Sequence, residues 1–326
     1  MKETTMNGTS QSASTRREFL GLLGAGAAAA SVGVLPRAAD AQQQSRRDSF
    51  RFVFLPDIHL MHERRSPQGM QAALRAAGRL DPRPDFLLTG GDLIDSLRDK
   101  TPDEAAELVD LFLRIWGDNT DLPAHHMLGN HDAAGWRNDS FPKDHPDFGY
   151  ALLQRRLKMP GLRHSFDHHG WHFVVLHNIR LIEPKSYISE FSEDQMRWLT
   201  SDLAPNKDKP TMLFGHFPPV SAVEFFDGRA KHDDGEWTLS SQRMSRNPGD
   251  LVRATEGANV KAFFSGHIHR LDRIEAAGRT FICAGSVSGS KWTGHDHETP
   301  EGITIVDCHA DGTFDYRYHD YGWEAT

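Results

Sequence analysis

Cysteine is scarce in this sequence, which limits how the protein can be stabilised. Two cysteines among 326 residues are too few for a disulfide scaffold. Neither Cys283 nor Cys308 has the spacing of a zinc thiolate site. Both lie in apolar, strand-like runs, which predicts buried thiols, although an oxidising compartment would also allow a bridge between them.

Long apolar runs and an excess of positive charge are also missing. Beyond the N-terminal region there is no run of eighteen or more apolar residues, so no membrane span is expected there. The formal net charge of -8 argues against a nucleic-acid partner, because binding a phosphate backbone favours a basic surface. With 25% charged and 38% hydrophobic residues, the composition is that of an ordinary globular protein.

The N-terminal region has the features of a targeting segment. Arg16 and Arg17 precede Phe19-Leu20, a weakly apolar Gly/Ala stretch follows over residues 21–34, and Ala39-Asp40-Ala41 has a small-x-small pattern. The segment resembles a bacterial twin-arginine export signal. We therefore expect residues 1–41 to be removed and residues 42–326 to form the mature protein. The predicted partner is the twin-arginine export machinery, and the predicted location is periplasmic or secreted.

The first half of the mature chain alternates strands and helices. Strands are predicted over residues 50–55, 86–88 and 123–128. One helix should begin with Ser66 as N-cap and Pro67 in its first turn, and another with a capping box formed by Thr101 and Glu104. Alternation of this kind implies a parallel sheet covered by helices, whose strands all end at one edge.

The second half is predicted to be richer in strands. A hairpin should turn at residues 168–170, a helix should begin at Ser192, and further strands are expected over residues 210–214, 260–264, 281–284, 303–308 and 313–318. Residues 133–160 and 220–248 lack strong periodicity and are predicted insertions over the site, the first with a short helix near residues 149–157. Trp136, His145 and Phe226 are their hypothetical pocket-wall residues.

Polar side chains follow five of the predicted strands. They are Asp57, His59, Asp92, Asn130, His131, His216, His267 and His269. Each motif alone has an ordinary structural explanation, such as a turn or a core histidine. However, each of the five motifs follows the end of a strand, and these strand ends should meet at one edge. Nitrogen and oxygen donors without thiolates suit zinc, manganese or iron. One ion takes four to six ligands, so this set indicates two ions, with Asp92 as the bridge.

These motifs resemble the signature of the calcineurin-like metallophosphoesterase superfamily, which runs Asp-x-His, Gly-Asp, Gly-Asn-His-Asp/Glu, His and Gly-His-x-His. The resemblance covers roughly residues 50–270. It implies an α/β fold, a four-layer α/β/β/α sandwich of two mixed sheets flanked by helices. It also implies two metal sites and two further roles. Asp57, His59, Asp92 and His269 would bind the first metal, Asp92, Asn130, His216 and His267 the second, while His131 would assist the leaving group and Asp132 would orient His131.

Two details narrow the resemblance. Purple acid phosphatases have a tyrosine three residues after the Gly-Asp aspartate, where this chain has Asp95. The run from Gly91 to Asp95, with Asp132 closing the third motif, resembles the cyclic-nucleotide and glycerophosphodiester phosphodiesterase branch. Pro56 departs from that branch, which usually has a small hydroxyl residue there, but it removes no ligand.

The expected function is an exported dinuclear-metal enzyme acting on a small phosphoester. A hydroxide bridging two iron, manganese or zinc ions would attack a phosphodiester. A phosphomonoesterase and a non-catalytic metal-binding protein are the alternatives, and the presence of His131 counts against the latter. His62, His125 and His126 lie near the ligand loops and are interpreted as structural or surface residues, with a substrate contact by one of them as the alternative. Residues 295–298, His-Asp-His-Glu, are interpreted as an exposed loop rather than a stray metal site. Natural substrate, metal identity and oligomeric state stay open.

Overall fold

The first of two large sheets contains the strands of the N-terminal half. In the computed structural model, which describes residues 49–325, its order is β15-β14-β1-β2-β3. The strands are β1 (Phe50–Leu55), β2 (Phe86–Thr89), β3 (Ala124–His125), β14 (Gly302–Cys308) and β15 (Phe314–Asp320). β1, β2 and β3 are parallel, as the alternating pattern predicted, and β14 and β15 add antiparallel strands. The predicted export signal, residues 1–41, and the predicted start of the mature protein at residue 42 lie outside the described residues.

The second sheet is also mixed and has the order β12-β13-β11-β8-β5-β4. Its strands are β4 (His164–His168), β5 (Trp171–Val175), β8 (Thr211–Phe214), β11 (Val260–Ser265), β12 (Leu271–Ala276) and β13 (Arg279–Ala284). The four inner strands are parallel, and the edge strands β4 and β12 are antiparallel to their neighbours. β12 was not predicted, because this edge strand is largely exposed and buries little apolar surface.

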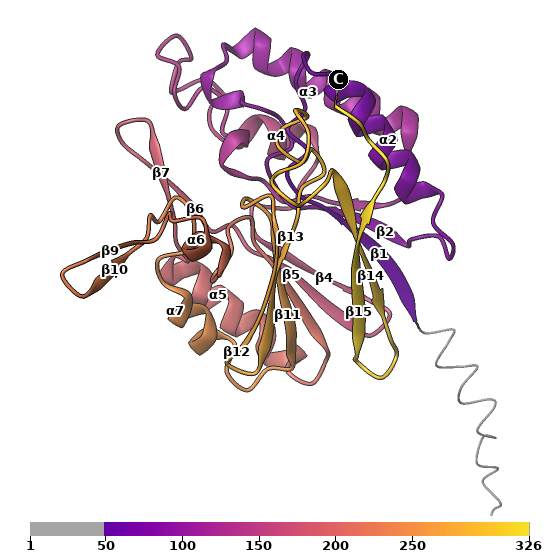
Figure 1. The fold of residues 1–326 in the computed structure, drawn as a ribbon, viewed down its shortest axis with the longest axis vertical. Helices are drawn as coiled ribbons and strands as arrows, with labels where there is room; N and C mark the ends of the chain where they lie inside the picture. The colour runs from indigo at the N-terminus through magenta and orange to yellow at the C-terminus, as the bar shows by residue number, and fades with distance from the viewer. Residues whose placement is uncertain (1–48, 326) are drawn as a thin grey trace, which may run out of the picture.

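Phenylalanines hold the two sheets face to face. Phe52 and Phe54 of β1 lie opposite Phe214 of β8 and Phe264 of β11, with ring centroids 5.5 to 6.5 Å apart, and all four side chains are fully buried. Residues alternating with them point to the outer faces, where helices cover them (Figure 1). The period-2 alternation of each strand therefore gives each of the two large sheets an inner face that packs on the other sheet and an outer face that packs on helices.

Helices form the two outer layers. α2 (Ser66–Gly78) and α3 (Pro102–Asn119) pack on the first sheet, and α5 (Glu193–Leu203) and α7 (Pro248–Ala254) pack on the second. The predicted four-layer α/β/β/α sandwich of two mixed sheets is therefore confirmed. No helix of residues 49–325 is long and apolar enough to cross a bilayer.

The shorter elements lie in the connections. They are η1 (Leu97–Asp99), η2 (Asn130–Asp132), α4 (Ala151–Arg156), β6 (Ile179–Ile182), β7 (Ser186–Ser189), η3 (Ala204–Asn206), α6 (Val223–Phe226), β9 (Lys231–Asp233) and β10 (Glu236–Thr238). The β9–β10 hairpin belongs to the segment 220–248 and projects from the body of the molecule at the left of Figure 1.

Some local predictions hold and others need correction. Thr101 and Glu104 form the predicted capping box of α3. Ser66 is not the N-cap of α2, because its hydroxyl is used by the backbone N–H and C=O of Met61, each at 2.8 Å, and Arg65 with φ 52° takes the N-cap position. Cys283 and Cys308 are free buried thiols on strands of different sheets.

Candidate dinuclear metal centre

The side chains singled out from the sequence meet at the carboxyl edge of both sheets. Asp57, His59, Asp92 and Asn130 follow strands of the first sheet, and His216, His267 and His269 follow strands of the second. Five of these seven residues have the left-handed backbone conformation, with φ between 46° and 67°. Such conformations are unfavourable for residues other than glycine and tend to cluster at functional sites. The site is therefore assembled across the sandwich rather than within one layer.

The first ligand group consists of Asp57, His59 and His269. Nε2 of His59 lies 3.1 Å from Nε2 of His269, and Asp57 Oδ1 lies 3.3 Å from that same atom of His269. The Nδ1–H of His269 donates to Gly289 O at 2.7 Å, which leaves the Nε2 lone pair for another partner. Asp57 Oδ1 is buried and has no hydrogen-bond partner among the described residues. An orphaned carboxylate oxygen facing two imidazole nitrogens is what a bound cation would satisfy.

The second group consists of Asp92, His216 and His267, with Asn130 beside it. His216 Nε2 lies 3.3 Å from Asp92 Oδ2 and 3.1 Å from Asn130 Oδ1. Backbone carbonyls orient both rings, because His216 Nδ1–H donates to Gly90 O at 2.9 Å and His267 Nε2–H donates to Gln242 O at 2.9 Å.

Asp92 lies between the two groups. Its Oδ2 atom is 3.3 Å from His216 Nε2 and 3.7 Å from His59 Nε2. Its Oδ1 atom accepts from the backbone N–H of His131 at 2.7 Å. The side chain is almost fully buried. A carboxylate shared by two sets of nitrogen and oxygen donors fits two cations such as zinc, manganese or iron.

Burial and the shared carboxylate set the protonation of the histidines. Burial lowers the pKa of His59 to about 4, so this imidazole is neutral at neutral pH, as a metal ligand must be. Burial would also lower the pKa of His216, but the adjacent Asp92 carboxylate raises it to about 9. A proton on His216 and a cation at Asp92 therefore satisfy the same negative charge, and they compete for it.

Asp95 links the metal ligands to His131. Its Oδ1 atom lies 3.2 Å from His59 Nδ1, 3.1 Å from His131 Nδ1 and 2.7 Å from Lys291 Nζ. Burial would raise the pKa of Asp95, but the hydrogen bonds from these three groups hold it well below its usual range. The sequence drew attention to Asp95 only as the replacement for a tyrosine, and nothing in it pointed to Lys291.

Asp132 was expected to orient His131, but its carboxylate makes its hydrogen bonds elsewhere. Its carboxylate accepts hydrogen bonds from three backbone N–H groups, those of Leu93 at 2.9 Å, Ile94 at 3.2 Å and Gly129 at 2.7 Å. Burial and the nearby Asp92 charge raise the pKa of Asp132 to about 7. Asp132 thus braces the loops after β2 and β3, and the carboxylate that touches the His131 ring is that of Asp95.

Arg98 is a second residue that sequence reasoning missed. The side chain is only 5% exposed, and its Nη2 atom lies 3.1 Å from His131 Nε2. Its Nε donates to Ser96 Oγ at 3.2 Å, and the guanidinium lies over the ring of Tyr187. Within residues 49–325 no carboxylate lies within ion-pair distance of this guanidinium, and its buried Nη1 atom has no hydrogen-bond partner there. A buried positive charge without a paired carboxylate favours negative charge in the site.

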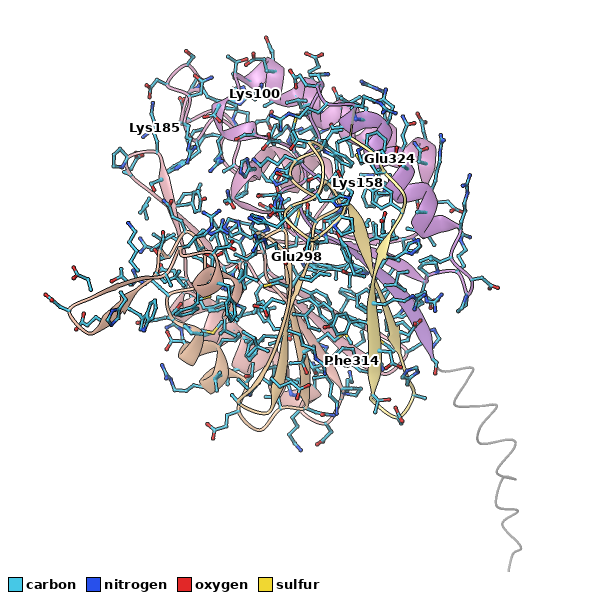
Figure 2. All side chains as sticks on the ribbon, in the orientation of Figure 1. Lys100, Lys158, Lys185, Glu298, Phe314 and Glu324 are labelled. Carbon is cyan, nitrogen blue, oxygen red and sulfur yellow. The ribbon has the colours of Figure 1, made fainter. Side chains whose placement is uncertain are left out.

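A cavity of about 540 Å³ opens beside the ligand histidines. It is lined by Asp227, Arg229, Arg243, His267, Ile268, His269, Ser290, Lys291, His295, Asp296 and His297. The segment 295–298, interpreted from the sequence as an exposed loop, therefore contributes to the wall. In Figure 2 the labelled Glu298, which directly follows His297, lies near the middle of the view.

The pocket-wall residues expected from the sequence are not in that lining. Trp136 packs against the core of the first sheet, and its Nε1–H donates to Ser186 O at 2.8 Å. His145 packs against Phe141. Phe226 is 88% exposed on α6, directly before the lining residue Asp227. The predicted insertion over residues 220–248 does reach the cavity, but through Asp227, Arg229 and Arg243 rather than through Phe226.

Comparison with known proteins agrees with this geometry. The chain is 26% identical over 272 residues to a 3′,5′-cyclic-nucleotide phosphodiesterase of Nostoc sp., covering 80% of this chain and 88% of that protein. It is 26% identical over 223 residues to a Rhodococcus erythropolis protein named "Probable cyclic nucleotide phosphodiesterase", covering 67% of this chain and 64% of the relative's length.

A solved structure has the same fold. A dimetal phosphatase from Danio rerio superposes with a TM-score of 0.56 at 16% identity, covering 84% of this chain and 99% of that one. At that identity the likeness concerns the fold alone. Residues 50–271, which contain every ligand residue described above, match the family of calcineurin-like phosphoesterases, and the chain belongs to that family.

Proposed function

We propose that the protein is an exported, metal-dependent hydrolase of phosphodiester bonds. The observation that carries the proposal is the position of Asp92 between two ligand groups, with Oδ2 within 3.7 Å of both His59 and His216. Two bound cations, held by Asp57, His59, Asp92 and His269 and by Asp92, Asn130, His216 and His267, would neutralise phosphoryl charge and lower the pKa of water. Iron, manganese and zinc all suit these donors.

His131 is the proposed proton donor to the leaving alcohol. Its Nδ1 faces Asp95 at 3.1 Å, and its Nε2 is 4.0 Å from Asp92 Oδ2, on the side of the ligand groups. Burial lowers the pKa of His131 in the free protein. A phosphate anion next to Nε2 would favour the protonated ring, which could then give the Nε2 proton to the departing oxygen.

A phosphomonoester is the second candidate substrate class. The uncompensated charge of Arg98 beside His131 favours it, because a monoester carries more negative charge than a diester. The Nostoc and Rhodococcus relatives described above are both named as phosphodiesterases of cyclic nucleotides, which supports the diester. A ratio of activities therefore decides between them.

The decisive experiment combines elemental analysis with a substrate panel. We expect two metal ions per chain, loss of activity on chelation, recovery on adding metal, and a higher kcat/KM for bis(4-nitrophenyl) phosphate than for 4-nitrophenyl phosphate. The number of metal ions per chain is measured in a His169→Gln variant. This substitution disrupts a partly exposed third group, Asp85, His168 and His169, which could bind an extra ion. Hydrolysis that survives chelation would overturn the proposal.

Export is tested separately. The twin-arginine-like segment supports a periplasmic or secreted protein that uses the twin-arginine machinery. Replacing both Arg16 and Arg17 by lysine should retain the precursor in the cytoplasm, whereas the unchanged chain should be recovered outside it. Equal distribution of the two proteins after cell fractionation would contradict export by this route.

A further inference from the structure

The cavity beside the metal ligands differs from a pocket for a nucleobase. Among residues 49–325, Ile268 is the only aliphatic residue in its lining, and no phenylalanine, tyrosine or tryptophan of that range contributes. Sites that bind a base or another flat apolar group usually offer aromatic or aliphatic walls. This cavity is instead surrounded by guanidinium, ammonium, imidazole and carboxylate groups. Its walls therefore suit a small polar group.

Arg243 is held rigidly at the edge of this cavity. Its Nε and Nη2 atoms donate to the carboxylate of Glu224, which is fully buried, at 3.0 and 2.7 Å. The paired geometry fixes the plane of the guanidinium. Among residues 49–325 Nη1 has no hydrogen-bond partner, and the preceding residue, Gln242, accepts a hydrogen bond from the ligand His267. Arg243 thus presents a fixed, unused donor next to the second ligand group.

The acidic residues of the wall are already occupied by another arginine. Arg270, which is 7% exposed, donates from Nη1 to Asp227 at 2.5 Å and from Nε to Asp296 at 3.4 Å. Within the described part of the chain Arg229 forms a single ion pair, to Asp227 at 3.8 Å, and its side chain is 53% exposed. Arg270 thus offsets part of the negative charge of both carboxylates, and Arg229 and Arg243 add further positive charge to the lining.

On the basis of the proposed function, we infer that this cavity binds one of the two alcohol portions of the diester. We infer further that this portion carries an anionic group in addition to the scissile phosphate. Arg243 and Arg229 bind that group, a carboxylate or a phosphate, while the scissile phosphate lies at the metal ligands. Charged hydrogen bonds of this kind are stronger than neutral ones and are geometrically specific. The substrate class is then a small anionic diester rather than a cyclic nucleotide.

Matched substrates test this inference. We would compare 4-nitrophenyl diesters of phosphate whose second alcohol is propyl, 2-carboxyethyl or 2-phosphonoethyl, with 3′,5′-cyclic AMP as the nucleobase-bearing compound. The metal-loaded protein should have a kcat/KM about tenfold higher for an anionic diester than for the propyl diester, the value of one charged hydrogen bond. The faster of the two anionic diesters identifies a carboxylate or a phosphate as the preferred group.

Variants locate the effect. Arg229→Gln changes an exposed side chain, and Arg243→Lys keeps a positive charge against Glu224 but removes the second edge of the guanidinium. Each should lower the ratio of anionic to propyl diester by about threefold or more. Arg197→Gln, on the outer surface of α5, is the matched control and should leave that ratio unchanged.

The outcomes separate the two proposals. If the propyl diester is hydrolysed as well as the anionic diesters, or if 3′,5′-cyclic AMP is the best substrate, the inference is overturned and the proposed diesterase activity stands. An anionic preference that both arginine variants retain also overturns it. If the metal-loaded protein hydrolyses no diester at all, the proposed function fails and the inference fails with it.

Discussion

Replacing Asp95 with asparagine should weaken both metal binding and turnover. The substitution keeps the shape of the side chain but removes the negative charge that faces His59, His131 and Lys291, at 3.2, 3.1 and 2.7 Å. The Nδ1–H of His59 would lose the carboxylate that accepts its hydrogen bond. That carboxylate fixes the orientation of the ring and makes Nε2 a more basic metal ligand. His131 would lose the partner that turns its Nε2 toward the ligand groups, and Lys291 would keep a positive charge near the cations.

The size of the effect follows from the role of such partners. Removing a carboxylate that orients a metal-bound histidine typically costs about 10- to 100-fold in affinity or activity. That range corresponds to about 1.4 to 2.8 kcal/mol. Because one carboxylate serves both rings, we expect a loss in this range for metal affinity and a separate loss in kcat when metal is saturating.

Chelator competition and steady-state kinetics measure the two losses. Metal affinity is obtained by titration against a fluorescent chelator, and kcat at saturating metal with bis(4-nitrophenyl) phosphate. Asp315→Asn is the matched control, because Asp315 pairs with His309 at 3.0 Å and its side chain is 84% exposed on β15. If Asp95→Asn keeps the affinity and the kcat of the unchanged protein, Asp95 does not position these histidines and our reasoning is wrong.

Three further predictions concern other parts of the molecule. His131→Gln should retain two metal ions by elemental analysis but lower kcat by about 10²- to 10⁴-fold, the usual contribution of a positioned acid; unchanged kcat would exclude the role. Burial alone would lower the pKa of His172, but its hydrogen bonds with Asp202 and Asp167, at 2.8 and 2.7 Å, raise it above 6.5. The stabilisation by this ring is therefore complete below pH 6.5 and is lost as the pH rises through the folded pKa. The difference in melting temperature between the unchanged protein and His172→Gln should shrink accordingly, and a pH-independent difference would contradict it. Phe264→Ala should lower the free energy of unfolding by about 3–5 kcal/mol in a urea titration, because it opens a cavity between the sheets; a loss below about 1 kcal/mol would mean that the layers repack.

Local patterns predicted the frame of the site well. A buried apolar run followed by a polar motif marks a strand end, and both the strands before Asp57 and Asp92 and those before His216 and His267 are where the pattern predicted them. The capping box at Thr101 depends on residues three apart and was predicted correctly. Ser66 shows the limit of the same rule, because a tight contact with Met61 uses its hydroxyl.

Residues missed in the sequence act through contacts between distant loops. Asp95 and Lys291 are 196 positions apart in the chain, and Arg98 reaches His131 from a different loop. No local period or spacing encodes such pairs. The cavity wall was missed for a similar reason, because its charged residues come from three separate segments. The aromatic residues of the two predicted insertions, Trp136 and Phe226, do not line the cavity.

The division of the ligands between two sheets has a consequence for how the molecule can come apart. Four donors belong to one layer and three to the other, and the layers are held in register by the buried phenylalanines and by hydrogen bonds between them, such as that from His216 to Gly90 O. Any sliding of one layer over the other would separate Asp92 from His216 and open both cation cages together. Hydrolytic capacity is thus a property of the docked pair, and neither half of the polypeptide, expressed alone, could retain it.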